Sequence, residues 1–290
     1  MMNSRRSFFK EVASATLATG FYSAVTKIEK AGIAPSPAKA TIPISKISSD
    51  LKVGIAGFTF SKSSLETAIS IMKRVEITNM SLKDNFLSLG SSEDKITAVV
   101  NQFNTAGIQL YAVGVIYMKT EAEVDRAFDY ARKVGARLII AAPEYSLLSY
   151  AESKVKSTKI RLAIHNHGPE DKLYPSPEDV WKRINNMDSG MGLCIDIGHS
   201  MRAGTNPAEA VLKYKSRLFD LHIKDVTGAF KDARPIELGR GVINFPELIM
   251  ALKKIDYSGM CSHEHEKDMT DLLPGLSESA GFFKGVMRTT

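Results

Sequence analysis

The chain has 290 residues, of which 44% are hydrophobic and 24% are charged, an ordinary balance for a globular protein that buries a sizeable core. The body of the chain has no apolar run of about 20 residues, which argues against a membrane span. The formal net charge is +6, but residues 1–40 account for +4 of it, and no basic run interleaved with aromatic residues follows. We therefore expect no nucleic-acid partner. Cys194 and Cys261 lie in apolar runs, where we expect free core thiols rather than a disulfide framework.

The N-terminal segment has the features of an export signal. Arg5 and Arg6 form a twin-arginine pattern with their neighbours, a mildly apolar run of small residues follows, and Ala38-Lys39-Ala40 offers a cleavage site. We interpret residues 1–40 as a Tat-type signal peptide and residues 41–290 as one catalytic domain. This predicts a periplasmic protein with no membrane contact beyond export. An amphipathic N-terminal helix is the alternative.

From residue 51 onward, apolar runs alternate with amphipathic stretches. We expect strands at 51–58, 75–78, 108–115 and 137–142, and four later strands with polar endings at 161–167, 193–199, 218–225 and 260–266. We expect helices near 64–74, 92–106, 120–134, 146–157, 177–186, 207–215, 246–254 and 271–288. Plausible N-caps precede the first three helices, at Ser63 or Ser64, at Ser91 or Ser92, and at Thr120.

This alternation of strands and helices predicts a parallel sheet with right-handed crossovers. Eight strand–helix units in about 240 residues fit a closed (β/α)₈ TIM barrel better than an open sheet. No Gly-x-Gly-x-x-Gly pattern follows the first strand, which weakens a dinucleotide-binding alternative. The active site of a TIM barrel lies at the carboxyl ends of its strands, where the four polar endings fall.

All six histidines of the chain lie in these four endings. Side chains alternate along a strand, so one inward-facing residue can be taken from each ending. The set is His165, Asp196, His222 and Glu264. Two imidazoles and two carboxylates suit one divalent metal ion such as Mn²⁺, Co²⁺ or Zn²⁺, with Fe²⁺ also compatible. A metal-free arrangement would bury several charges side by side, so we predict a metal centre here.

Other polar residues near the strand ends have structural as well as functional interpretations. His263 and His265 have the opposite parity to the predicted ligand of their strand, and we expect them to pack or to face the surface. Lys224 and Asp225 could form an ordinary ion pair at a strand end. Glu144 could simply cap the helix that follows it.

Several of these segments resemble motifs of a known superfamily. The segments IDIGH, LHIKD with the later GRGVINF, and YSGMCSHEHE are similar to the xylose isomerase-like sugar isomerase/epimerase superfamily over roughly residues 51–266. The resemblance implies a metal-binding TIM barrel in which Asp196, His222 and Glu264 match three of the superfamily's four ligands. It also implies that His199 contacts the substrate.

The fourth ligand position departs from the superfamily pattern. Where the superfamily commonly has Glu-Asn-His, this chain has His165-Asn166-His167. In the epimerases of the superfamily, two ligating glutamates flank the substrate and exchange protons with it on opposite faces. In this chain His165 stands in the place of one of these glutamates. The resemblance therefore favours chemistry with one base and one acid over symmetrical epimerisation.

We expect the reaction to begin with removal of a proton alpha to a sugar carbonyl. Candidate catalytic residues are Glu264, Glu144 and His167 as bases and His199 and Lys224 as acids, with substrate contacts from Asn166, Asp225, Arg240 and Glu266. Export and the lack of a Gly-rich phosphate loop favour an unphosphorylated keto sugar.

The favoured hypothesis is a lyase or hydratase acting on a 3-keto-glycoside. The nearest alternative is a keto-sugar isomerase or epimerase. Two others are a non-catalytic sugar-binding barrel and a member of the apurinic endonuclease branch of the fold. The net charge of about +2 on residues 41–290 disfavours the last of these, because DNA binding needs a basic face.

Overall fold

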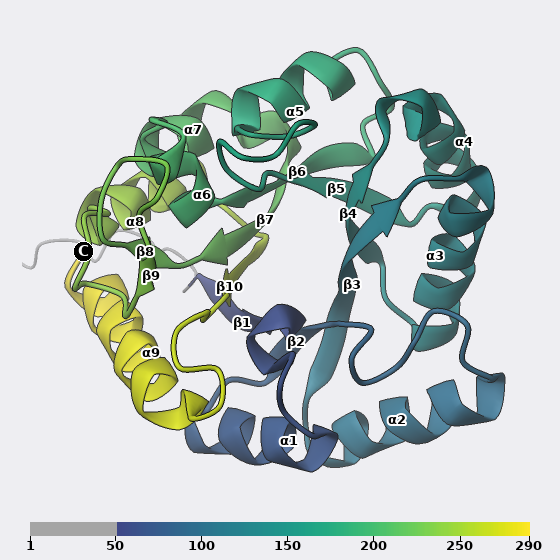
Figure 1. Ribbon diagram of the computed structural model, residues 1–290, viewed down its shortest axis with the longest axis horizontal. Helices are drawn as coiled ribbons and strands as arrows, with labels where there is room; N and C mark the ends of the chain where they lie inside the picture. Colours follow the sequence, from purple (N-terminus) through teal and green to yellow (C-terminus); the bar gives the residue numbers. More distant parts are fainter. Residues whose placement is uncertain (1–50) are drawn as a thin grey trace, which may run out of the picture. The chain divides into compact units, whose positions relative to one another are not determined.

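The computed structural model describes residues 51–290, so the predicted signal peptide at 1–40 lies outside the described residues. Parallel strands close into a barrel in the order β1-β10-β7-β6-β5-β4-β3-β2, and helices surround it (Figure 1). This arrangement confirms the predicted (β/α)₈ TIM barrel. Within residues 51–290, no helix combines the length and the apolar character that crossing a membrane requires.

The barrel strands are short and mostly buried, because side chains fill the interior and helices cover the outside. They are β1 (Lys52–Ala56), β2 (Asn79–Leu82), β3 (Gln109–Met118), β4 (Leu138–Pro143), β5 (Arg161–His165), β6 (Met191–Asp196), β7 (Leu218–Ile223) and β10 (Met260–His263). A separate antiparallel pair is formed by β8 (Asp225–Val226) and β9 (Pro235–Ile236). Cys194 and Cys261 are buried free thiols, as predicted.

The helices are α1 (Leu65–Arg74), α2 (Glu93–Thr105), α3 (Glu121–Val134), α4 (Leu148–Thr158), α5 (Pro177–Ile184), α6 (Ile197–Arg202), α7 (Pro207–Lys213), α8 (Phe245–Lys254) and α9 (Leu272–Thr289). Predicted N-caps are confirmed at Ser64, Ser92 and Thr120, whose side chains each accept a hydrogen bond from the backbone N–H three residues later. Thr120 and Glu123 form a reciprocal capping box, and Gly135 ends α3 in the left-handed region at φ 83°.

The predicted second strand at 75–78 is wrong. Val75 closes α1, since its N–H donates to the carbonyl of Ile71, and Glu76 has a left-handed φ of 56°. The strand β2 begins only at Asn79. A run of four residues is too short to separate a strand from the turn that ends a helix.

The chain after Asp196 also differs from the predicted strand ending. Asp196 caps α6, because its Oδ1 accepts a hydrogen bond of 2.7 Å from the His199 N–H. His199 therefore lies in the first turn of a helix instead of on a strand. Six residues carry too little periodicity for such a helix to be predicted.

A buried carboxylate organises the long connection between β7 and α8. The Oδ1 atom of Asp225 accepts hydrogen bonds from the N–H groups of Val226 and Ile243, and its Oδ2 accepts them from Gly239 and Gly241. All four distances lie between 2.9 and 3.1 Å. Four backbone hydrogen bonds satisfy both oxygens of this buried carboxyl group without a cation. Asp225 thereby holds this connection against the end of β7.

This contact predicts that Asp225→Asn destabilises the protein by about 3 kcal/mol, because the amide nitrogen would face backbone donors in a buried site. Denaturant unfolding of the two proteins measures the loss. Asp232→Asn, an exposed change in the same connection, is the control and should stay within about 0.5 kcal/mol of the parent. Equal stability of the two variants would contradict the structural role of Asp225.

Candidate functional site

Four neighbouring strands bring two imidazoles and two carboxylates together at the carboxyl end of the barrel. His165 ends β5, Asp196 ends β6, His222 lies in β7, and Glu264 directly follows β10. One ligand atom from each residue lies within 4.8 Å of those of the other three. The Nε2 of His165 is 3.5 Å from Asp196 Oδ2, and the Nδ1 of His222 is 3.3 Å from Glu264 Oε2. We call these four residues the ligand cluster.

The residues of the ligand cluster fit a divalent cation. His165, Asp196 and His222 are buried, and both ring nitrogens of the two histidines, with Asp196 Oδ2, lack a hydrogen-bond partner among the described residues. Buried polar atoms are ordinarily paired, so a convergent group of unpaired nitrogen and oxygen atoms favours a metal ion. Cys194, predicted only as a core thiol, also groups with His165 and His222 within the same limit.

Lys224 places an ammonium group against this cluster. Its Nζ lies 3.0 Å from Asp196 Oδ2, 2.7 Å from Glu264 Oε2 and 2.5 Å from Glu266 Oε1. Burial lowers the pKa of Lys224, but Asp196 and Glu264 outweigh this effect and hold the pKa well above its usual range. Burial raises the pKa of Glu264, but Lys224 and the neighbouring imidazoles outweigh it and hold it well below its usual range. Lys224 is therefore protonated and Glu264 ionised.

Two further imidazoles line the same end of the barrel as neutral groups. Burial lowers the pKa of both His167 and His199 to about 3, so neither is protonated at neutral pH. His199 lies between two cations, with its Nε2 3.5 Å from Lys224 Nζ and its Nδ1 3.1 Å from a guanidinium nitrogen of Arg202. The Nε2 of His167 is 2.9 Å from the hydroxyl of Tyr117, and the two rings are stacked.

Two predicted substrate contacts have their polar atoms engaged by the protein itself. The side-chain oxygen of Asn166 accepts the Asp196 N–H, and its amide donates to the Asp196 carbonyl and the Ser200 hydroxyl. Asn166 thus holds the turn from β6 into α6. Asp225 is occupied by four backbone N–H groups, as described above. It also forms no ion pair with Lys224, which pairs with the carboxylates of the cluster instead.

The structure does not bring Arg240 or Glu144 to the ligand cluster. The guanidinium of Arg240 donates to Glu278 of α9 at the surface. Glu144 is half-buried after β4, and among the described residues no hydrogen bond or ion pair joins its side chain to the cluster. Glu266 does reach the site through Lys224. The functional roles of these residues stay predictions.

Some polar residues near the site escaped sequence reasoning. The predicted third strand ended at residue 115, whereas β3 continues and carries Tyr117 to the site. Deeper in the barrel, the Tyr111 hydroxyl donates to Asp220 at 2.7 Å and lies 2.6 Å from the Ser262 hydroxyl. Burial raises the pKa of Asp220 to about 7. Asp220 lies two residues before His222, and this parity was the available signal.

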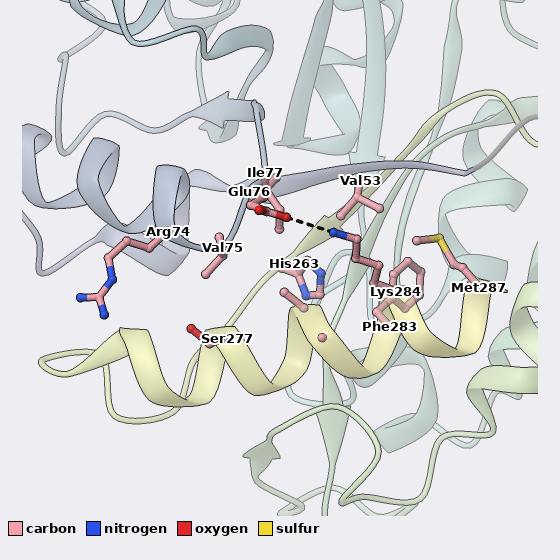
Figure 2. Close-up of a pocket in the computed structure, with 12 residues that line it drawn as sticks. Val53, Arg74, Val75, Glu76, Ile77, His263, Ser277, Phe283, Lys284 and Met287 are labelled. Carbon is pink, nitrogen blue, oxygen red and sulfur yellow. Dashed lines mark hydrogen bonds and ion pairs between the residues drawn. The ribbon is translucent and has the colours of Figure 1, made fainter. Parts of the chain in front are cut away.

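His263 packs away from the site, as its parity predicts. Its ring lies on the outer side of the barrel against Phe283 of α9, with ring centroids 5.8 Å apart. Figure 2 shows it facing a cavity of about 320 Å³, together with Val53 and residues of the turn that ends α1. None of the predicted site residues lines this cavity. The candidate chemistry therefore belongs to the barrel interior.

Comparisons with known sequences place these features in a family. The family model described as xylose isomerase-like TIM barrel matches residues 73–286. The chain is 22% identical over 258 residues to an inosose dehydratase from Clostridium botulinum, covering 72% of this chain and 83% of that protein. It is 36% identical over 95 residues to the protein MJ1311 from Methanocaldococcus jannaschii, a match that spans only 31% of either chain.

Solved structures show the same fold. A protein from Parabacteroides distasonis aligns with a TM-score of 0.64 and 27% identity, covering 81% of this chain and 99% of its own. An L-ribulose 3-epimerase aligns with a TM-score of 0.67 and 15% identity over 82% of this chain and 95% of its own. The IolI protein with a bound zinc atom aligns with a TM-score of 0.66 and 16% identity over 82% and 97%. Since the family model matches well over half of the chain, this protein belongs to the xylose isomerase-like TIM barrel family.

Proposed function

We propose that this protein is an exported, metal-dependent enzyme that removes a proton alpha to the carbonyl of an unphosphorylated keto sugar and expels a beta leaving group. The observation that carries the proposal is the ligand cluster, with one donor atom from each of four residues within 4.8 Å. Family membership supports an enzyme that acts on a sugar or a related small molecule. Export rests on the twin-arginine pattern at Arg5 and Arg6.

His165, Asp196, His222 and Glu264 would hold one divalent ion, and the zinc atom in the IolI structure supports this assignment. When bound, the ion supplies a Lewis acid that polarises the sugar carbonyl and stabilises the negative charge of an enediolate. The pKa values of two ligands suit this role. Burial lowers the pKa of His165 and keeps the ring neutral, while Glu264 is ionised.

The base and the acid of the proposed reaction are different kinds of group. Every ion pair of Glu264 among the described residues involves Oε2, which leaves Oε1 to accept a proton from the sugar. His167 is an alternative base on the Tyr117 side of the site. The ammonium of Lys224, with His199 beside it, is the candidate proton donor for a leaving oxygen.

His165 favours elimination among the reactions of this family. A neutral imidazole stands where a second glutamate would serve as the opposite base, so symmetrical epimerisation lacks one carboxylate. Elimination needs one base and one acid. The base takes the alpha proton, and the C–H electrons form the enediolate. The carbonyl then re-forms as a C=C bond forms between the alpha and beta carbons, the beta C–O electron pair leaves with the oxygen, and that oxygen takes a proton from the acid. Similarity to inosose dehydratase over most of the chain supports this outcome.

We propose a 3-keto-glycoside as the substrate, with its aglycone as the leaving group. The carbonyl at C3 makes the hydrogen at C2 acidic, and the glycosidic oxygen at C1 is then in the beta position. Export argues against a phosphorylated sugar, and the chain carries no Gly-rich phosphate loop.

The metal assignment predicts that the protein binds about one Co²⁺ per chain, measured by its visible absorption spectrum. His222→Ala should weaken Co²⁺ binding by about a hundredfold or more. Substituting a residue that merely hydrogen-bonds a metal ligand already weakens metal binding by about 10- to 100-fold, and His222 is itself a proposed ligand. His263→Ala removes a buried imidazole from the outer face of the same barrel and should leave Co²⁺ affinity unchanged. Equal affinities in the two variants would exclude the ligand cluster as the metal site.

The assignment of the base predicts a large catalytic loss in Glu264→Gln. Loss of a general base lowers kcat by about 10²- to 10⁴-fold, so the metal-loaded variant should fall in that range with a 3-keto-glycoside. Glu76→Gln alters an exposed ion pair with Lys284 and serves as the control. Near-parent turnover by Glu264→Gln, in protein shown to hold its metal, would remove Glu264 from the proposed role.

Turnover of p-nitrophenyl 3-keto-glucoside in D₂O distinguishes elimination from isomerisation or epimerisation. We expect release of p-nitrophenol together with a dehydrated keto sugar. An isomerase or epimerase would instead incorporate solvent deuterium into an intact glycoside without releasing the phenol. Mass spectrometry of the sugar and absorbance of the phenol decide between the two.

A further inference from the structure

We propose that Lys224 is a resident cation of the metal centre, whose ammonium competes with the metal ion for Asp196 and Glu264 and pairs with Glu266 when the ion binds. The inference rests on the proposed function, because it requires a metal ion in the ligand cluster. It concerns affinity and the position of the ammonium, which are measurable apart from turnover.

The ammonium draws on the same two oxygens that face the imidazole ligands. Asp196 Oδ2 is 3.0 Å from Lys224 Nζ and 3.5 Å from His165 Nε2. Glu264 Oε2 is 2.7 Å from Lys224 Nζ and 3.3 Å from His222 Nδ1. A metal ion bound by the four ligands would draw on the same two carboxylates. Two cations cannot share them without repulsion at short range.

The three carboxylates around Lys224 are not equivalent partners. Glu266 lies nearest to the ammonium, and its Oε1 accepts a hydrogen bond of 2.5 Å from Lys224 Nζ. Asp196 and Glu264, whose oxygens lie 3.0 and 2.7 Å from the ammonium, belong to the ligand cluster, whereas Glu266 does not. The ammonium therefore retains its hydrogen-bonded partner if Asp196 and Glu264 turn to a metal ion.

The stem of Lys224 is confined, so the ammonium cannot avoid the competition by withdrawing into solvent. The side chain is only 3% exposed. It passes over the first turn of α6 at Gly198, where a Cβ atom would lie 2.3 Å from Lys224 Cγ and 2.8 Å from Cδ. Glycine at this position makes room for the stem. The polar groups in contact with the ammonium are the three carboxylates and His199.

The charge balance gives the expected direction of the effect. With its three carboxylate partners ionised, Lys224 leaves a net charge of −2, which matches one divalent ion. Replacing the ammonium by a neutral side chain leaves a net charge of −3. The three carboxylates then attract the metal ion more strongly, and without the ion they repel one another more strongly. Lys224 thus lowers metal affinity and stabilises the protein in the absence of metal. Once the ion binds, the ammonium stays on Glu266 beside His199, where the proposed proton donor is needed.

The test is Co²⁺ titration of the full chain, followed by visible absorption, for the parent and for Lys224→Met. We expect the variant to bind Co²⁺ about tenfold more tightly, a change of about 1.4 kcal/mol. Its thermal unfolding temperature should fall without metal and rise more on adding Co²⁺ than in the parent. Lys154→Met is the control. It breaks an ion pair between Lys154 of α4 and Asp125 of α3, and should leave Co²⁺ affinity within about twofold of the parent.

A second pair of variants keeps the test decisive if Lys224→Met folds poorly. Glu266→Gln removes the partner that receives the ammonium, so Co²⁺ should bind more weakly than in the parent. In the Lys224→Gln background the same change should have a smaller effect, because no ammonium remains to be displaced. Equal effects in the two backgrounds would overturn the inference.

The outcomes separate this inference from the proposed function. Co²⁺ binding that His222→Ala abolishes but Lys224→Met leaves unchanged would overturn the competition and keep the metal centre. Failure of the parent protein to bind Co²⁺ would overturn both. Tighter binding by Lys224→Met with a lower unfolding temperature without metal supports the inference.

Discussion

The concentration of buried carboxylates at one end of the barrel is the constraint on which the site depends. A parallel barrel directs the carboxyl ends of its strands to one place, so Asp196, Glu264 and Glu266 converge there. Ionised carboxylates removed from water are strongly destabilising unless cations or hydrogen-bond donors meet them. Lys224 contacts all three, and the surrounding backbone accommodates its stem at Gly198. One ammonium group therefore contacts all the carboxylates that converge at this end of the barrel.

The buried carboxylates of the chain are stabilised in two ways. The difference separates Asp225, which has a structural role, from Asp196 and Glu264 of the ligand cluster. Asp225 accepts hydrogen bonds from four backbone N–H groups, which occupy both of its oxygens and hold the connection between β7 and α8 together. Asp196 and Glu264 instead contact a cation and imidazoles whose nitrogens have no other partner. The first arrangement is complete within the protein. The second leaves buried nitrogen and oxygen atoms without hydrogen-bond partners among the described residues, as the proposed metal centre requires.

Much of the architecture could be predicted because its signals are local. The N-caps at Ser64, Ser92 and Thr120 were found by residue type and position alone, and parity along the strands selected His222 and Glu264 while assigning His263 to the outer face. The strand order of the barrel then places the inward-facing residues of these strands close together. Their convergence therefore follows from parity and topology, without knowledge of any single contact.

The predictions that were wrong or incomplete concern features that depend on single contacts or on tertiary structure. The short helix α6 and the true start of β2 depend on single capping and turn contacts within segments of four to six residues, which carry little periodicity. Lys224 and Arg240 have long side chains whose partners are set by tertiary structure: one reaches three carboxylates inside the barrel, and the other reaches Glu278 at the surface. Tyr117 required the full length of β3.

His165 connects the charge of the site with its proposed chemistry. A glutamate at this position, as in the superfamily motif that the sequence resembles, would add a fourth carboxylate to those of Asp196, Glu264 and Glu266. The Lys224 ammonium would then leave −3 instead of −2, and one divalent ion would no longer balance the site. The imidazole removes that charge and, with it, the second base that two-sided proton exchange would use. The remaining groups differ in kind: carboxylates and an ammonium lie at the ends of β7 and β10, and neutral His167 lies after β5 beside Tyr117 of β3. Such asymmetry suits a reaction in which one group takes a proton and a different group returns one to a departing oxygen.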